Sequence, residues 1–170
     1  MGDPRFAVDR MLGRLARWLR LLGFDAIYRP ELPGRRLLTL AAREGRVLLT
    51  RDRRLGRART PVEVVCIAPD RFREQLRELD RCHALAPSAT RPSRCIECNA
   101  AVEPVARESL PASVPEYVRT TQSEFRRCPR CARIYWRATH WQRMCAEIER
   151  LGLRTPPPSG LAGAPTEGCA

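Results

Sequence analysis

The first half of the chain alternates between short apolar runs and longer amphipathic stretches. Four apolar runs have the length and composition of buried strands: residues 6–9, 24–28, 46–50 and 62–67. Three longer stretches repeat apolar positions at helical spacing: residues 10–22, 33–45 and 70–85. Gly23 and Gly45 are placed to end the first two helices. Strands that alternate with helices in this order predict an α/β fold, a parallel sheet with helices on both faces.

The first predicted helix has two distinct faces. One face is apolar and contains Met11, Leu12, Leu15, Ala16, Trp18, Leu19 and Leu22. The opposite face carries Arg10, Arg14, Arg17 and Arg20, with Leu21 as its one apolar side chain. A basic stripe of this kind is either an ordinary solvated surface or a track for a polynucleotide backbone. Because the stripe starts beside Asp9, the second interpretation is slightly favoured for Arg10, Arg14 and Arg17.

The pattern changes after residue 85. Residues 84–94 are rich in Ala, Pro and Ser and have the composition of a linker, whereas residues 95–136 show little regular periodicity. A capped helix is expected at 139–151, and the Pro- and Gly-rich tail has the composition of a disordered segment. The sequence thus predicts an α/β core at 1–85, a linker at 86–94, a small second domain at 95–152 and a disordered tail at 153–170.

Two Cys-x-x-Cys pairs give the second domain its most specific chemical signal: Cys95 with Cys98, and Cys128 with Cys131. Four thiolates form a closed tetrahedral zinc site, which is structural rather than catalytic. The 29 residues between Cys98 and Cys128 exceed the compact spacing of common zinc modules and predict an inserted excursion. Disulfides or unrelated thiols are the competing interpretation. Cys66, in the fourth strand, is expected to be a core residue.

Acids recur where the predicted strands end. Asp9 closes the first strand, Asp52 follows the third and Asp70 follows the fourth. The carboxyl ends of parallel strands share one edge of the sheet, where ligand sites form. Taken alone, Asp52 needs only to start a turn, because Asp is common after strands. Two or three acids at one edge make a divalent-metal site the better interpretation.

Four aromatic side chains flank the second cysteine pair: Phe125, Tyr135, Trp136 and Trp141. Arginines are interleaved with them, and rings that stack bases beside arginines that hold phosphates are typical of a single-strand nucleic-acid platform. Trp136 and Trp141 are the candidates for base stacking. A small zinc domain also has few other side chains from which to build a core, and packing is the slightly favoured interpretation.

The charge balance favours a polyanionic partner. The net charge is +12, and every one of the 31 Lys or Arg residues is an arginine. A field of this sign attracts nucleic acid. No apolar run has the length of a signal peptide core or a membrane span, so a cytoplasmic location without a membrane partner is expected. Thiols stay reduced in that compartment, which favours metal ligation.

Four segments together resemble a known family: FAVDRMLGRLARWLRLLGFD, EGRVLLTRDRRL, RCIECN and RCPRCARIYWRATHW. They are similar to the PIN-like ribonuclease domain at the carboxy terminus of the Mut-seven exonuclease family, and the likeness covers residues 6–151. It implies a PIN-like nuclease core followed by a zinc ribbon, with Mg²⁺ or Mn²⁺ as the catalytic metal and RNA as the substrate. Asp9 and Asp52 match the family's acids, and the four paired cysteines match its ribbon.

One position departs from the family pattern. The family has an acid at the start of the second helix, where this chain has Gly34. Glu31, three residues upstream, is the nearest acid, and Glu31 or Asp70 is the candidate further ligand. Arg10, Arg14 and Arg51 are the candidates for positioning the RNA backbone.

The expected activity is metal-dependent hydrolysis of RNA phosphodiester bonds, since the chain has two histidines and no Ser–His or Cys–His arrangement. The alternative is a catalytically impaired RNA-binding module with a structural zinc ribbon, for which Gly34 is the best support. A third interpretation is a zinc-ribbon scaffold that binds protein. That class predicts binding insensitive to salt, whereas RNA binding weakens steeply as salt rises.

Overall fold

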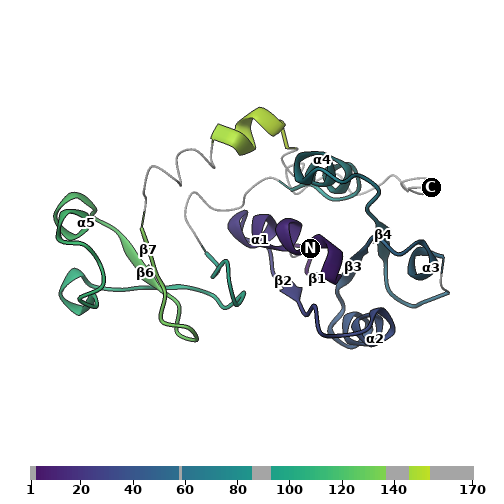
Figure 1. Ribbon diagram of the computed structural model, residues 1–170, viewed down its shortest axis with the longest axis horizontal. Helices are drawn as coiled ribbons and strands as arrows, with labels where there is room; N and C mark the ends of the chain where they lie inside the picture. Colours follow the sequence, from purple (N-terminus) through teal and green to yellow (C-terminus); the bar gives the residue numbers. More distant parts are fainter. Residues whose placement is uncertain (1–2, 58, 86–92, 137–145, 154–170) are drawn as a thin grey trace, which may run out of the picture.

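The first half of the chain folds around a four-stranded parallel sheet. The computed structural model describes residues 3–57, 59–85, 93–136 and 146–153. The strands are β1 (Phe6–Val8), β2 (Ala26–Tyr28), β3 (Val47–Thr50) and β4 (Val64–Cys66), in the order β2-β1-β3-β4 (Figure 1). All three strand pairs are parallel, so the carboxyl ends of the strands lie at one edge of the sheet.

Helices cover both faces of this sheet, as the alternating pattern predicts. Helices α1 (Gly13–Leu21) and α4 (Phe72–Cys82) pack on the face that carries Phe6 and Val8. Helix α2 (Gly34–Glu44) packs on the opposite face, against Ala7 and Leu48. Adjacent residues of β1 thus point to opposite faces, which is the period-2 alternation of a strand. The α/β fold class is confirmed.

Two short elements stand at the carboxyl edge of the sheet. The first predicted helix begins as a 3₁₀ turn, η1 (Arg10–Leu12), before it continues as α1. A one-turn helix, α3 (Arg53–Gly56), follows β3, where the sequence predicts only a turn. Both begin directly after one of the candidate acids, Asp9 or Asp52, and each acid is the N-cap of its element.

The second domain is a three-stranded antiparallel sheet of order β5-β6-β7, drawn in green in Figure 1. Its strands are β5 (Glu103–Pro104), β6 (Phe125–Arg127) and β7 (Ile134–Trp136). The predicted excursion between the cysteine pairs contains η2 (Arg107–Ser109) and α5 (Glu116–Thr121). It brings its own small core of Leu110, Val114, Val118 and Phe125.

A further helical segment over 146–151 packs against the α/β core. Leu151 belongs to the same apolar cluster as Phe6 and the inner faces of α1 and α4, with Ile148 and Leu153 beside it. The described part of the helix expected at 139–151 therefore contacts the first domain, although the sequence groups it with the second. The domain boundaries themselves stay predictions. Trp141 and the start of that helix lie outside the described residues.

Three burial expectations from the sequence are wrong. Arg20 and Leu21, placed on the solvent side of α1, are 4% and 7% exposed, because the first cysteine loop covers that side. Met11, placed on the apolar face, is 61% exposed, because η1 turns it away from the core. Cys66 is exposed, since β4 is an edge strand with one face only partly covered. None of the helices in the described part of the chain has the length and hydrophobicity of a transmembrane segment.

Candidate functional site

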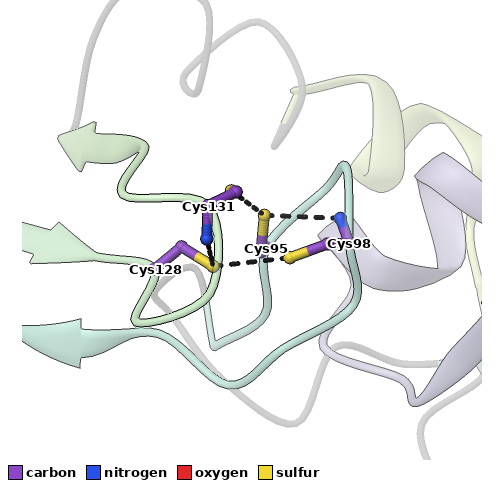
Figure 2. Close-up of side chains that lie close together, drawn as sticks. All are labelled: Cys95, Cys98, Cys128 and Cys131. Atoms are coloured by element: carbon purple, nitrogen blue, oxygen red, sulfur yellow. Dashed lines mark hydrogen bonds between the residues drawn. The ribbon is translucent and has the colours of Figure 1, made fainter.

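Four cysteines from two loops converge beside the antiparallel sheet. In Figure 2 the side chains of Cys95 and Cys98 point toward those of Cys128 and Cys131. The Cys95 and Cys131 sulfurs are 3.5 Å apart, the Cys98 and Cys128 sulfurs 3.4 Å, and all four lie within 4.8 Å of one another. A zinc–sulfur bond of about 2.3 Å in a tetrahedron places sulfurs about 3.8 Å apart. The four thiols therefore fit a single tetrahedral ion, and zinc suits this donor set.

The two cysteine loops have the same local geometry. In each, the second cysteine donates its backbone N–H to the sulfur of the first, at 3.5 Å for Cys98 and 3.4 Å for Cys131. The following residue is left-handed in both loops, Asn99 at φ 66° and Ala132 at φ 58°. Its N–H bonds back to the carbonyl of the first cysteine at 2.9 Å. Each turn thus directs its two thiols toward the centre of the four-cysteine cluster, with backbone N–H groups beside the sulfurs.

The electrostatics of the cluster favour a thiolate at Cys95. Burial opposes the charge, but hydrogen bonds from Tyr135 and from the Cys98 backbone outweigh it and lower the pKa of Cys95 to about 6. The Tyr135 hydroxyl lies 3.0 Å from the Cys95 sulfur, and burial together with this neighbour raises the pKa of Tyr135. Burial and the adjacent thiols raise the pKa of Cys98 to about 12. Four crowded thiols cannot all ionise without a cation to hold them.

The first cysteine loop is docked on the edge of the α/β sheet. The buried Arg20 guanidinium donates to the carbonyl oxygens of Ile96 and Glu97 at 2.8 and 2.7 Å and to that of Ala26 at 2.8 Å. The Asn99 side chain accepts from the Ala26 N–H at 3.0 Å. Edge strand β2 thereby has a backbone donor satisfied by the ribbon, so the ribbon closes an edge that is otherwise open to pairing.

Asp25 lies at the centre of the charged groups in the junction between the first cysteine loop and the edge of the parallel sheet. Its carboxylate accepts from the Arg46 guanidinium at 2.7 Å and from the Asn99 amide at 2.7 Å, and Arg94 lies 3.5 Å away. Burial alone raises the pKa of Asp25, but the hydrogen bonds from Arg46 and Asn99 outweigh it and hold the pKa below its usual value. Neither Asn99 nor Arg46 is a candidate from the sequence; the only signal is a side-chain amide directly after a Cys-x-x-Cys loop.

At the carboxyl edge of the parallel sheet, Asp9 and Asp52 are linked through Thr50. The Thr50 hydroxyl donates to Asp9 Oδ2 at 2.8 Å and accepts from the Asp52 N–H at 3.0 Å. Asp9 Oδ1 accepts from the Arg10 N–H at 2.7 Å, so this buried carboxylate is fixed in orientation. Each carboxylate oxygen has two lone pairs, which leaves capacity for a cation. Thr50 is missed from the sequence; its signal is a hydroxyl at the end of an otherwise apolar strand.

Within the described residues, the candidate acids do not form a group of three around Asp9. Asp52 is exposed and its Oδ1 caps α3 by accepting from the Arg54 N–H at 2.8 Å. Glu31 is exposed and 4.0 Å from Arg29, and Asp70 is 85% exposed and paired with Arg51 at 2.6 Å. Among the described residues, the four cysteines are the one group of three or more acidic, His or Cys side chains placed to hold a single ion.

Gly34 begins α2 in close contact with α3. A Cβ at this position lies 2.5 Å from Leu55 Cδ1, so the Leu55 methyl fills the space that a side chain at residue 34 needs. The position where the resemblance predicts an acid is therefore in apolar contact with Leu55. Glu31 lies in the turn before Pro33 and α2.

The candidate RNA-binding residues differ in exposure and in what they contact. Arg10 and Arg14 are exposed, and the Arg14 guanidinium lies 4.0 Å over the Phe72 ring. Arg17 is engaged with Glu97 of the first cysteine loop at 2.7 Å. Trp136 is half-buried against the small ribbon core, which favours the packing role for this ring.

The fold and the cysteine cluster define an α/β domain joined to a compact zinc-ribbon-like module. A family model for the Mut7-C RNAse domain matches residues 4–148, and the chain belongs to that family. The match spans both the parallel sheet and the four cysteines, in agreement with the resemblance seen in the sequence. Comparison with curated proteins and with solved structures finds no match.

Proposed function

We propose that this protein is a metal-dependent ribonuclease whose reaction takes place at the carboxyl edge of the parallel sheet. The observation that carries the proposal is the Asp9–Thr50–Asp52 arrangement at that edge, in a chain of the Mut7-C RNAse family with a net charge of +12. Zinc at the four cysteines has a structural role in this proposal. The catalytic ion is Mg²⁺ or Mn²⁺, which prefers carboxylate oxygen.

The chain's own residues have separate tasks in this proposal. Asp9, fixed by Thr50 and the Arg10 N–H, and Asp52, at the start of α3, hold the ion. The bound ion supplies a nucleophilic water and charge stabilisation at the phosphate. Arg10 and Arg14, exposed on the first turns after Asp9, position the RNA backbone beside it. Glu31 and Asp70 are further ligands only if they leave their arginine partners.

The test is cleavage of a labelled single-stranded RNA by zinc-loaded protein with added Mn²⁺ or Mg²⁺. Asp9→Asn and Asp52→Asn are expected to lower the rate by at least about 100-fold, since loss of a ligand removes several kcal/mol of stabilisation. Thr50→Val, which releases Asp9 without removing it, is expected to lower the rate by about 10- to 100-fold. Glu103→Gln, an exposed acid of the ribbon, is the matched control and leaves the rate unchanged. Equal rates for all variants refute the proposal.

A second candidate is an RNA-binding module that has lost catalysis, and the Gly34–Leu55 contact favours it. It predicts that the wild-type protein binds RNA and does not cleave it under any metal condition. The double variant Gly34→Asp/Leu55→Ala supplies an acid and the space for it. Cleavage gained by the double variant, and not by Leu55→Ala alone, assigns the loss to the missing ligand. Cleavage by the wild type refutes this candidate.

A further inference from the structure

A basic groove opens between η1 and the start of α4. Its volume is about 570 Å³, and its arginines are Arg14, Arg71, Arg73 and Arg77. Met11 forms part of the wall and is the most exposed large apolar side chain of the α/β core among the described residues. The sequence alone points to Arg14 in this set and misses Arg71, the N-cap of α4, and Arg73 and Arg77 within that helix.

The groove carries an excess of positive charge after its ion pairs are counted. Of its acids, Asp70 is paired outward with Arg51, and of its arginines, Arg73 is paired with Glu147 of the 146–151 helical segment. Arg14, Arg71 and Arg77 remain, and the carboxylates near them are Glu74 in the groove and Glu147, which is paired with Arg73 and lies close enough to act on Arg77. Three cations that face one hollow repel each other unless an anion lies between them. The groove is therefore complementary to a chain of phosphates.

Both walls of the groove begin at the acidic edge of the sheet. Met11 lies in η1, whose N-cap is Asp9, and Asp70 is tied to Arg51, the neighbour of Asp52 in the chain. The Gln75 amide donates to the carbonyls of Pro69 and Asp70 at 2.9 and 3.3 Å and fixes the loop before α4. The groove thus adjoins the residues that stand next to Asp9 and Asp52.

The floor of the groove suits a single strand. The Phe72 ring stacks on Trp18 with centroids 5.1 Å apart, and Arg14 lies over the same ring. This stack holds the Arg14 guanidinium in place, while the exposed Met11 side chain offers an apolar contact to an unstacked base or a ribose. Proteins that bind single-stranded nucleic acid combine such apolar contacts with a positive groove.

We propose that the groove between η1 and α4 binds the backbone of single-stranded RNA next to the acidic edge, with Arg14, Arg71 and Arg77 facing phosphates. This inference rests on the proposed ribonuclease function, because it extends the substrate path from the same site. In this proposal the RNA strand lies on the side of the parallel sheet that α1 and α4 cover, and not on the side that α2 covers.

The test measures binding of a short labelled single-stranded RNA by fluorescence anisotropy, with zinc-loaded protein and no added Mg²⁺ or Mn²⁺. The double variant Arg71→Ala/Arg77→Ala removes two exposed arginines of the groove. The matched control, Arg43→Ala/Arg81→Ala, removes two exposed arginines from the last turns of α2 and α4. Both double variants change the net charge equally, so a general electrostatic effect acts on both. Thermal melting checks that each variant is folded.

The groove variant is expected to weaken binding on the order of tenfold at about 0.1 M salt, and to lower the slope of log K against log salt by about 1.4, or about 0.7 for each lost contact. The control is expected to change affinity by less than about twofold. If both double variants weaken RNA binding equally, or if neither weakens it, the proposed role of the groove is overturned. Displacement of the RNA by polyglutamate at equal charge concentration also overturns it, because the site is then a general polyanion surface.

The same variants separate this inference from the nuclease proposal. If the wild type never cleaves RNA but the groove variant loses affinity and the control does not, the groove is confirmed and the nuclease proposal fails. If the wild type cleaves and both pairs bind RNA equally, the nuclease proposal stands and the groove fails.

Discussion

The α/β core and the ribbon differ in what holds them together. The core buries a continuous apolar cluster from β1, β3, α1 and α4, in which Phe6, Leu15 and Leu19 are fully buried. Among the described residues, the ribbon has one small cluster of four buried apolar side chains and a second in which Val102 packs beside the cysteines, whose four sulfurs lie within 4.8 Å of one another. A domain of that size needs a metal where a larger one needs only apolar area. The stability of the two regions should therefore respond to different perturbations.

The largest expected effect is that of removing the metal. Structural zinc contributes about 10 kcal/mol or more to folding of small modules, so chelation should unfold the ribbon while the α/β core stays folded. Hydrogen exchange should rise sharply across β5, β6 and β7 and much less in β1 and β3. Cys98→Ser should behave like chelation. Cys66→Ser, at an exposed thiol outside the cluster, is the control that leaves exchange unchanged. If the amides of the ribbon stayed protected from exchange without metal, the ribbon would not depend on a metal for its stability.

The second test breaks the junction between the two regions. Arg20→Met is expected to cost about 2–4 kcal/mol, because three carbonyl oxygens, two of them in the first cysteine loop, lose a buried charged donor. Arg17→Met removes an exposed pair with Glu97 and should cost less than about 1 kcal/mol. Denaturant unfolding measures both. Equal costs would mean that the buried guanidinium contributes no more than the surface pair.

Arg20 also marks the limit of sequence-based prediction here. Periodicity over η1 and α1 correctly predicts Leu12, Leu15 and Leu19 in the core, because those positions pack on the neighbouring sheet. It fails at Arg20 and Leu21, whose environment is a loop more than 70 residues later in the chain. Local pattern carries no information about which distant segment covers a helix's second face.

The candidate sites also combine features that local sequence predicts with features that depend on distant segments. The spacing of the cysteines is local within each pair, and their convergence in one cluster follows the prediction. The link from Thr50 to Asp9 joins residues 41 positions apart, and the groove arginines of α4 face a 3₁₀ turn from the start of the chain. Sequence reasoning found the acids that end strands. It could not find Thr50 or the groove arginines Arg71, Arg73 and Arg77, because their partners come from distant segments of the chain.

Acid should weaken the junction before it weakens the core. The pKa of Asp25 is held below its usual value, so its contribution is fully present above the unfolded pKa near 4 and is lost as pH falls through the folded one. Asp25→Asn is expected to cost about 1–2 kcal/mol at pH 7 and to flatten the dependence of stability on pH below about 4. Asp3→Asn, at an exposed acid, is the control. Unfolding at several pH values, with zinc in excess, measures the slope; an unchanged slope in Asp25→Asn would refute the assignment.

The smallest expected effect tests whether the two cysteine loops are equivalent. Both place a residue in the left-handed region, but Asn99 tolerates it whereas Ala132, at φ 58°, does not. Ala132→Gly should stabilise the ribbon by about 0.5–1 kcal/mol, because glycine removes the strain. Asn99→Gly relieves no comparable strain and removes the side-chain bonds to Ala26 and Asp25, so it should destabilise the junction. Zinc-loaded thermal melts of the two variants should therefore shift in opposite directions. Stabilisation by both substitutions would mean that the two loops are equivalent and that docking through Asn99 adds no stability; destabilisation by both would mean that Ala132 is not strained.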